Sequence, residues 1–451
     1  MTPPDIPLGY GIDFGTSNSS VSIAYPDRVE VLALGGSTSR TLPSFVYLHR
    51  AGRREAGNEA VRTFLVSGHE KTDCWKCPLA PYGWDTDCRQ YRKGGGCNDA
   101  RLLSGVKHEL AKLGFAGTNS WATDFSVGAL VSVVLSRLKG EADEATGHAV
   151  GSVVLGHPVV FAGADPEDRA ASDAEAFRRL EQAALEAGFR EVAFLPEPTA
   201  AVIGEHAHRG VEIAVDFGGG TFDVAVLDSR DEAPRVAGIA GIAIGGETLD
   251  GILFETIVGP ALGLDALPSW LFNELRTASS VRLLMADPGI PAILARIGGK
   301  AAEVVHALLY GGHAYEFYRA VEAAKIALSN TETTHVEFAP LGLRVEVRRS
   351  TFESMIRPEL DLIADTTTTA LAEAGMKASD VDRVLLTGGS AYIPAFRNDL
   401  ALIFGNDRLE QRDAFTAVVH GLGVRAQQLW GPVAVKRFAS PTELGAIDQS
   451  R

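Results

Sequence analysis

The sequence predicts an α/β protein built from two similar lobes that face each other. Three observations lead to this prediction. The chain has 451 residues, which is enough for two large lobes. Short apolar strands alternate with amphipathic helices. A strand–turn–strand segment also occurs twice, at residues 11–24 and 214–227, and we interpret it as the mark of a duplicated domain.

The two copies of the repeat read GIDFGTSNSSVSIA and AVDFGGGTFDVAVL. An offset of 203 residues places Asp13 on Asp216, together with the Phe-Gly pair that follows each aspartate. In both copies alternating apolar residues flank a run of Gly, Thr and Ser, which is the pattern of a β-hairpin.

Further strands are expected at residues 152–156, 191–195 and 383–387. Residues 165–187 have the pattern of a helix, with Asp165 as its cap and Gly188 after its end. The apolar stripe of this helix is expected to consist of Ala170, Phe177, Leu180 and Ala184.

The composition narrows the class of protein. Hydrophobic residues make up 46% and charged residues 22%, which is typical of globular proteins. With 57 acidic and 42 basic residues the net charge is −15, so a nucleic-acid partner is not expected. No apolar run reaches the length of a membrane span, and the N-terminus lacks the pattern of a signal peptide. We therefore expect a cytoplasmic protein that does not associate with membranes.

The two glycine-rich turns of the repeat have the chemistry of a phosphate site. Glycines let backbone N–H groups approach an anion, and Thr and Ser add hydroxyl donors. The aspartate before each turn, Asp13 or Asp216, can orient water on a divalent cation. Two such turns would clamp a polyphosphate, although each could also be only a tight turn. No GxxxxGK[ST] loop is present, which excludes a P-loop enzyme.

Two further glycine motifs follow apolar strands, at residues 245–247 and 386–390. Glu322, Lys325 and Ser329 have the spacing of one helix face. Taken alone, the glycines could be strand-to-helix turns, and the helix face could be a solvated edge.

These motifs together resemble the nucleotide-binding domain of the DnaK-type, 70-kDa heat-shock chaperones, within the actin-like ATPase superfamily. The resemblance is closest to the short YegD-like members that lack a peptide-binding domain, and it covers most of residues 9–430. The motifs that carry it are GIDFGTSNS at 11–19, EPTAA at 197–201, VDFGGGTFD at 215–223, GGETLD at 245–250 and LLTGGSAYIP at 385–394.

The resemblance implies an actin-like ATPase fold, in which two lobes close on ATP and each contains a ribonuclease-H-like mixed sheet flanked by helices. It divides the chain into lobe I at 1–210, lobe II at 211–407, a return helix to lobe I at 408–430 and a tail at 431–451. A Cys-rich insertion at 70–104 belongs to lobe I.

The resemblance also implies roles for individual residues. Asp13 and Asp216 would hold Mg²⁺ through waters, while Lys107 and Glu197 would position the attacking water. Asp223 would assist with the metal or with a monovalent cation. The phosphates would be held by Gly15, Thr16, Ser17, Asn18, Gly218, Gly219, Gly220 and Thr221.

The adenosine side carries departures from the family. Ile326 and Tyr392 occupy positions where the chaperones place arginines, so Tyr392 is expected to stack on adenine instead. Pro158 and Arg169 resemble the switch proline and arginine that relay the nucleotide state. The residues expected at the nucleoside are Gly245, Gly246, Glu322, Lys325, Ser329, Gly388, Gly389, Ser390 and Tyr392.

All four cysteines lie together, at Cys74, Cys77, Cys88 and Cys97. A CxxC pair with two nearby thiolates predicts a four-cysteine zinc site that orders the insertion. An iron–sulfur cluster, disulfides or four unrelated thiols are the alternatives. Basic and aromatic residues interleave with the cysteines and would either bind a partner or pack around the metal. The neighbouring His108 is interpreted as a surface or core histidine.

The function expected from these features is that of a DnaK-like ATPase with bound ATP or ADP, Mg²⁺ and Zn²⁺, and without a peptide-binding domain of its own. Client or partner proteins would meet the nucleotide domain or the insertion. One alternative is a sugar-type kinase of the same superfamily, for which no catalytic aspartate motif is evident. The other is a scaffold that binds ATP without turnover.

Overall fold

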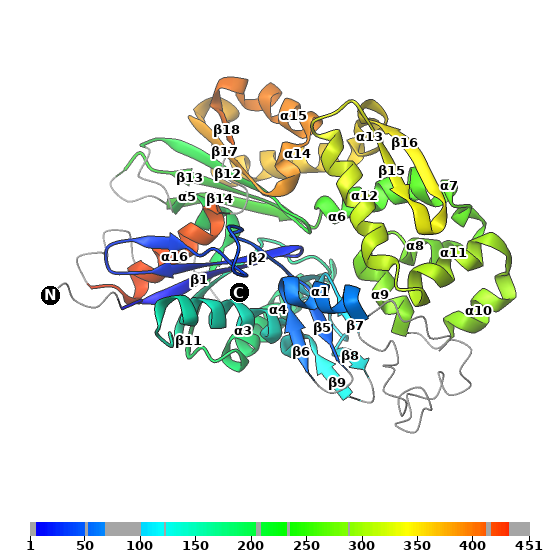
Figure 1. The fold of residues 1–451 in the computed structure, drawn as a ribbon. Helices are drawn as coiled ribbons and strands as arrows, with labels where there is room; N and C mark the ends of the chain where they lie inside the picture. Colours follow the sequence, from blue (N-terminus) through cyan, green and yellow to red (C-terminus); the bar gives the residue numbers. More distant parts are fainter. Residues whose placement is uncertain are drawn as a thin grey trace.

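In the computed structural model, two mixed β-sheets lie one above the other (Figure 1). Helices cover both outer faces, and two more helices lie between the sheets. The four cysteines and the segment around them lie outside the described residues, so the zinc prediction concerns a part of the chain that the structure does not describe. The structure describes residues 6–49, 53–67, 101–120, 123–203, 209–231, 235–286, 289–411 and 416–432.

The first sheet has the strand order β11-β10-β1-β2-β3, and β4 also pairs with β2. The pairs β1–β10 and β10–β11 are parallel, whereas β1–β2 and β2–β3 are antiparallel. The strands are β1 (Gly9–Phe14), β2 (Asn18–Ala24), β3 (Val29–Val31), β4 (Leu42–Pro43), β10 (Ser152–His157) and β11 (Glu191–Pro196).

The second sheet repeats this pattern in the order β14-β13-β12-β17-β18, with its parallel and antiparallel pairs in the same places. The duplication predicted from the two hairpins is therefore present in the strand topology. The strand β18 belongs to this sheet although it lies beyond residue 407. The strands are β12 (Val211–Phe217), β13 (Phe222–Asp228), β14 (Arg235–Ile242), β17 (Arg383–Thr387) and β18 (Leu409–Gln411).

The helices of the two halves also correspond. In each half, two strands extend the sheet in parallel to the first strand of the hairpin: β10 and β11 in the first half, β17 and β18 in the second. One helix precedes this pair of strands, one connects the two strands and one follows them. In the first half these helices are α3 (Val127–Thr146), α4 (Arg169–Glu186) and α5 (Glu197–Ile203). In the second half they are α14 (Arg357–Glu373), α15 (Pro394–Phe404) and α16 (Ala417–Trp430).

The last helix of each half lies between the sheets and packs on the sheet of the other half (Figure 1). The side chain of Val202 in α5 packs against Ala214 and Leu385 of the second sheet. In α16, Leu422 belongs to a cluster with Ala24 and Val154 of the first sheet. The two halves are thus joined by a pair of crossed connections rather than by one linker.

Hydrogen bonds fix α16 on the first sheet. The Ser22 hydroxyl donates to the Val419 carbonyl at 2.6 Å, and the Gln427 amide donates to the Tyr25 carbonyl at 2.6 Å. These contacts join residues about 400 positions apart in the sequence. Among the helices that the structure describes, none has both the length and the apolar character to span a membrane.

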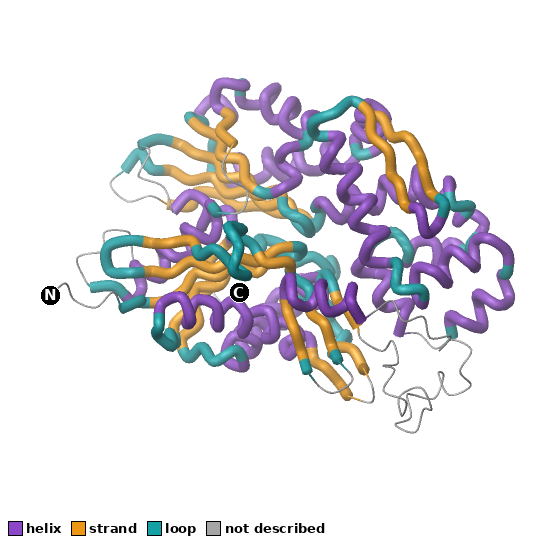
Figure 2. Tube along the Cα trace, in the orientation of Figure 1, coloured by secondary structure: helices purple, strands orange, loops and turns teal. Residues whose placement is uncertain are grey.

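Each lobe carries an arm on the same side of the molecule, rich in strands in the first lobe and in helices in the second (Figure 2). The first arm contains β5 (Val46–Leu48), β6 (Arg54–Ala56), α1 (Gly57–Ser67), β7 (Arg101–Leu103), β8 (Gly117–Ser120) and β9 (Thr123–Ser126). The second contains α6 (Gly246–Leu253), α7 (Gly259–Ala261), α8 (Ser269–Glu274), α9 (Ala278–Ala286), α10 (Ile290–Ile297), α11 (Gly299–Tyr310), α12 (Ala314–Leu328), β15 (Thr333–Phe338), β16 (Leu343–Arg348) and α13 (Arg349–Met355).

The predicted helix at 165–187 begins later than expected. Its N-cap is Asp168, whose side chain accepts a hydrogen bond from the Ala171 amide at 3.3 Å. Asp165 instead closes a preceding turn by accepting from the Glu167 amide at 2.9 Å. Because the Asp165 carboxylate is bonded within this preceding turn, the helix begins only at Arg169. Ala170 is exposed, and the buried residues are Ser172, Ala176, Arg179, Leu180, Ala183 and Ala184.

Candidate functional site

The two glycine-rich turns, one from each lobe, approach each other. A Cβ added at Gly219 would lie 3.0 Å from the Ser17 hydroxyl, and one added at Gly220 would lie 2.7 Å from the Thr16 hydroxyl. A side chain at Gly220 would therefore separate the turns. The structure thus brings together, from opposite lobes, the two turns that the sequence predicts to clamp a phosphate chain.

The second turn is held by its own backbone and by the helix that packs on it. The Gly218 amide donates to the Thr221 carbonyl at 3.0 Å. From the start of α6, the amides of Gly246 and Glu247 donate to the carbonyls of Gly218 and Gly219 at 3.0 and 2.8 Å. The position of α6 is consequently tied to the shape of this turn.

Acidic side chains gather beside the turns. Asp13 and Asp216 lie near the ends of β1 and β12, Asp223 lies at the start of β13, and Glu197 begins α5. Lys107 lies in the short 3₁₀ helix Val106–Glu109 and places its Nζ 2.7 Å from Glu197 Oε1, with both residues buried. The structure therefore places Asp13, Asp216 and Asp223 beside the Lys107–Glu197 pair, and Thr221, the other residue expected to be catalytic, lies at the end of the second turn.

The carboxylates influence one another. Burial and, second to it, the charge of Glu197 raise the pKa of Asp13 to about 8 and those of Asp216 and Asp223 to about 7, while Lys107 opposes these shifts. Burial lowers the pKa of Lys107, but the attraction of Glu197 and Asp13 outweighs it, so that the net shift is upward. The cluster thus places four carboxyl groups around one ammonium group, and carboxylate oxygens are the donors that Mg²⁺ prefers.

Hydrogen bonds fix two of these carboxylates. The Thr387 hydroxyl donates to Asp216 Oδ1 at 3.2 Å. Asp223 accepts from the Thr221 hydroxyl at 2.7 Å and from the Val159 amide at 2.8 Å. Since Val159 follows β10 of the first sheet, Asp223 connects the two lobes directly.

The segment that carries Val159 contains the predicted switch residues. The Arg169 side chain donates to the Val159 carbonyl at 2.8 Å, and the Pro158 carbonyl lies 2.8 Å from His157 Nδ1. Burial lowers the pKa of His157, although its hydrogen bond to Pro158 opposes this shift. Val159 thus connects both residues to Asp223: Pro158 directly precedes it in the chain, and Arg169 is bonded to its carbonyl.

Three predicted nucleoside segments converge on the second turn. Lys325 in α12 donates to the Gly246 carbonyl and to Asp250, each at 2.8 Å. The Ser390 hydroxyl donates to the Gly218 carbonyl at 3.1 Å. Gly388 has φ +83°, and a Cβ there would lie 2.2 Å from the Phe217 carbonyl oxygen, so glycine is required.

Other predicted nucleoside residues have different surroundings. Glu322 forms an ion pair with Arg319 on the same helix, and Ser329 is the C-cap of α12. Tyr392 is 46% exposed. Within the described part of the chain, these three residues form no hydrogen bond or ion pair with the glycine-rich turns.

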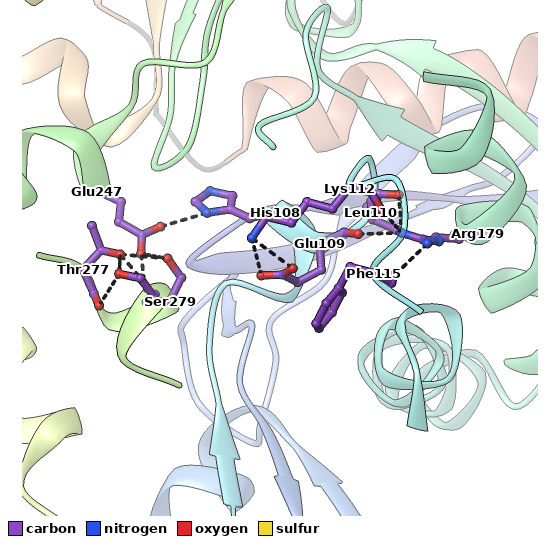
Figure 3. Close-up of polar contacts among 10 residues, drawn as sticks. His108, Glu109, Leu110, Lys112, Phe115, Arg179, Glu247, Thr277 and Ser279 are labelled. Carbon is purple, nitrogen blue, oxygen red and sulfur yellow. Dashed lines mark hydrogen bonds and ion pairs between the residues drawn. The ribbon is translucent and has the colours of Figure 1, made fainter. Parts of the chain in front are cut away.

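The structure adds His108, which the sequence alone did not mark as functional. Its Nδ1 lies 3.2 Å from Glu247 Oε2 in α6, so this pair connects the two lobes (Figure 3). Two features of the sequence could have pointed to His108. It directly follows Lys107, and a glutamate, Glu247, follows the Gly245-Gly246 pair. Neither feature identifies a partner without the fold.

The fold and this site define a class of protein with two α/β lobes of common topology and paired glycine-rich turns over buried carboxylates. The model of the family described as Hsp70 protein matches residues 9–261 and 313–440, and the chain belongs to this family. It is 24% identical over 438 residues to the chaperone protein DnaK of Thermosipho melanesiensis, covering 93% of this chain and 59% of the relative. The figures are the same for the chaperone protein DnaK of Thermosipho africanus. The chain thus spans less than two thirds of these relatives.

Proposed function

We propose that this protein binds ATP between its lobes and hydrolyses it to ADP and phosphate, as a chaperone-type member of the Hsp70 family. The observation that carries the proposal is the meeting of the two glycine-rich turns over the cluster that contains the Lys107–Glu197 pair. Phosphoryl transfer needs positioning and charge neutralisation more than covalent assistance, and the site supplies residues for both.

The phosphates would be held by the backbone amides of the two turns and by the hydroxyls of Thr16, Ser17 and Thr221. The charge of the acidic cluster fits a cation, so Asp13 and Asp216 would hold Mg²⁺ through waters, with Asp223 assisting. When bound, Mg²⁺ would neutralise charge on the phosphates. Asp13 and Asp216 come from opposite lobes, so the cation would need both of them in place.

Lys107 and Glu197 would orient the water that attacks the terminal phosphate. The raised pKa of Lys107 keeps its Nζ an ammonium donor, and the Glu197 carboxylate accepts hydrogen bonds. Their contact at 2.7 Å fixes both side chains before a substrate arrives. Such preorganisation reduces the entropy cost of bringing the water into line.

The nucleotide state would reach the protein surface through Asp223. This residue accepts from Thr221 of the phosphate turn and from Val159 of the other lobe. A change at the phosphate would thus move the segment that contains Pro158, to which Arg169 is bonded. This is the relay that the family resemblance implies.

The nucleoside would lie between α12 and the turn at 388–390. Lys325 and Ser390 shape this side through their bonds to the second turn. Because Tyr392 is partly exposed, its ring is free to stack on a base. Glu322 and Ser329 would contact the ribose from α12.

The proposal extends to the Cys-rich insertion, which lies outside the described residues. Zinc held by Cys74, Cys77, Cys88 and Cys97 would order the insertion, which could then contact clients or partner proteins. Metal analysis of the reduced protein tests this point. The lobe boundaries predicted from the sequence and a cytoplasmic location complete the proposal.

Phosphate release from ATP tests the function, with and without candidate sugars. Wild-type protein should hydrolyse ATP without an acceptor, and Lys107→Ala, Glu197→Ala and Thr221→Ala should each lower kcat by about 100-fold or more. Lys112→Ala serves as the control, because this lysine is partly exposed and pairs with Glu109. Transfer that depends on a sugar would favour the kinase alternative. Tight ATP binding without turnover would favour the scaffold.

A further inference from the structure

His108 reaches from the first lobe to the second. Its Nδ1 lies 3.2 Å from Glu247 Oε2, with about one sixth of each side chain exposed (17% and 18%). Glu247 is itself oriented, because its Oε1 accepts from the Ser279 amide at 3.1 Å and from the Ser279 hydroxyl (Figure 3). The carboxylate that faces the imidazole is therefore held in place by the second arm.

The other ring nitrogen of His108 is directed at the phosphate turns. A Cβ added at Gly220 would lie 2.6 Å from His108 Nε2 and 2.7 Å from the Thr16 hydroxyl. This Nε2 is buried and has no hydrogen-bond partner in the described structure. A buried polar nitrogen without a partner is unfavourable, so its position at the junction of the two turns indicates that a ligand satisfies it.

The charges around the turns make an anionic ligand the best match. Lys107 is already paired with Glu197, and Lys325 is paired with Asp250. Among the residues that the structure describes, His108 is therefore a basic group at the turns with a nitrogen still to be satisfied. An imidazolium has two N–H donors, of which Nδ1–H would be directed to Glu247 and Nε2–H to the turns.

We propose that His108 binds the phosphates of the nucleotide through Nε2, and that Glu247 is the residue that positions it. The proposal rests on the proposed nucleotide function and adds a residue to that site. Because the His108–Glu247 pair spans the lobes, the same side chain couples occupancy of the phosphate site to lobe closure. The moiety recognised is the polyphosphate, not the nucleoside.

Binding measurements that separate phosphate from nucleoside test the proposal. Titration calorimetry with ATP, ADP and adenosine would compare wild type with His108→Ala, His108→Gln and Glu247→Gln. A lost charge-assisted hydrogen bond corresponds to roughly 10- to 100-fold weaker binding of ATP and ADP in His108→Ala. Adenosine affinity should stay within about twofold. In His108→Gln, whose amide can still donate, affinity should be partly restored. In Glu247→Gln, the loss should be smaller and confined to the phosphate-bearing ligands.

The controls distinguish this proposal from the general function. Lys112→Ala changes a cation close in sequence without touching the lobe contact and should leave all affinities unchanged. If His108→Ala does not fold, as judged from its melting curve, Glu247→Gln carries the test, because its loss of affinity must be confined to ATP and ADP. Equal losses for ATP and adenosine, or no loss for either, would overturn the role of His108. Wild-type protein that binds neither ATP nor ADP would overturn the proposed function as well.

Discussion

Asp13 illustrates how a single carboxylate in this site depends on a cation. Its pKa is raised to about 8 by burial and by the charge of Glu197, whereas an aspartate in an unfolded chain titrates near pH 4. Native protein without a cation therefore binds more protons than unfolded protein over this interval. Its stability falls as the pH rises from about 4 to about 8.

We expect Asp13→Asn to weaken this pH dependence. In the presence of a chelator, the variant should be more stable than wild type at pH 8, by about 1 to 3 kcal/mol, and should lose this advantage near pH 5. Urea unfolding at both pH values measures the difference. The exposed Asp265→Asn is the control. Parallel pH profiles for Asp13→Asn and wild type would contradict the assigned cause.

Sequence and structure differ in what they reveal about single residues. The two aspartates and the glycine turns are expected from a local motif that occurs twice, whereas Lys107 is expected only from the family resemblance, and the roles of all of them stay predictions. His108 could not be predicted, because its significance lies in Glu247 and Gly220, which are more than 100 positions away. The helix cap is Asp168 and not Asp165. Either aspartate could cap a helix by its sequence, and only the structure shows that Asp165 accepts from the Glu167 amide while Asp168 accepts from the Ala171 amide.

At the level of elements, the resemblance implies a return helix to lobe I at 408–430, the range in which α16 lies, but nothing in the sequence indicates that α5 packs on the second sheet. The duplicated hairpins predicted two similar sheets, and the strand orders confirm them. That each half places its last helix on the other sheet depends on close backbone approach. A Cβ at Gly421 of α16 would lie 1.7 Å from the Ala200 carbonyl oxygen of α5.

Gly421→Ala should therefore destabilise the protein strongly. The added methyl group cannot be accommodated against backbone, and overpacking of this kind costs about 3 kcal/mol. Denaturant unfolding measures the loss. Gly140→Ala in α3 is a matched control, because a Cβ there meets nothing within 4 Å, and it should stabilise by about 0.5 to 1 kcal/mol. Equal stability of the two variants would show that α5 and α16 separate easily.

One set of elements lies outside the family match. Residues 262–312 separate the two matched ranges and contain α8 to α11. The same region supplies Ser279, which orients Glu247. The part of the second arm that lies outside the matched ranges is thus the part that orients Glu247 toward His108.

At the scale of the whole molecule, the arms also meet through aromatic rings. Phe45 of the first lobe and Tyr315 of α12 form an edge-to-face pair with ring centroids 5.2 Å apart. Together with His108 and Glu247, this pair connects the lobes away from the crossed helices. Opening of the lobes would have to break both contacts.

Tyr315→Ala should consequently speed the release of ADP. Loss of an aromatic pair worth about 0.5 to 1.5 kcal/mol corresponds to roughly 2- to 10-fold faster dissociation. Stopped-flow release of a fluorescent ADP measures it. Phe45→Ala should have the same effect, and the double variant should add little. Leu402→Ala, on an exposed face of α15, should leave the rate unchanged. Strict additivity of the two ring deletions would argue against a shared contact.

The crossed position of α16 has a consequence for how the protein is made. Residues 9–24 form two central strands of the first sheet, yet the helix that covers one face of them is the last element before residue 432. At about 5 to 20 residues per second, a ribosome would need roughly 20 to 80 seconds to pass from one to the other. Throughout that interval the apolar face around Ala24 and Val154 is without its native cover. The first lobe of this Hsp70 family member thus completes its own folding only after the ribosome has passed residue 430.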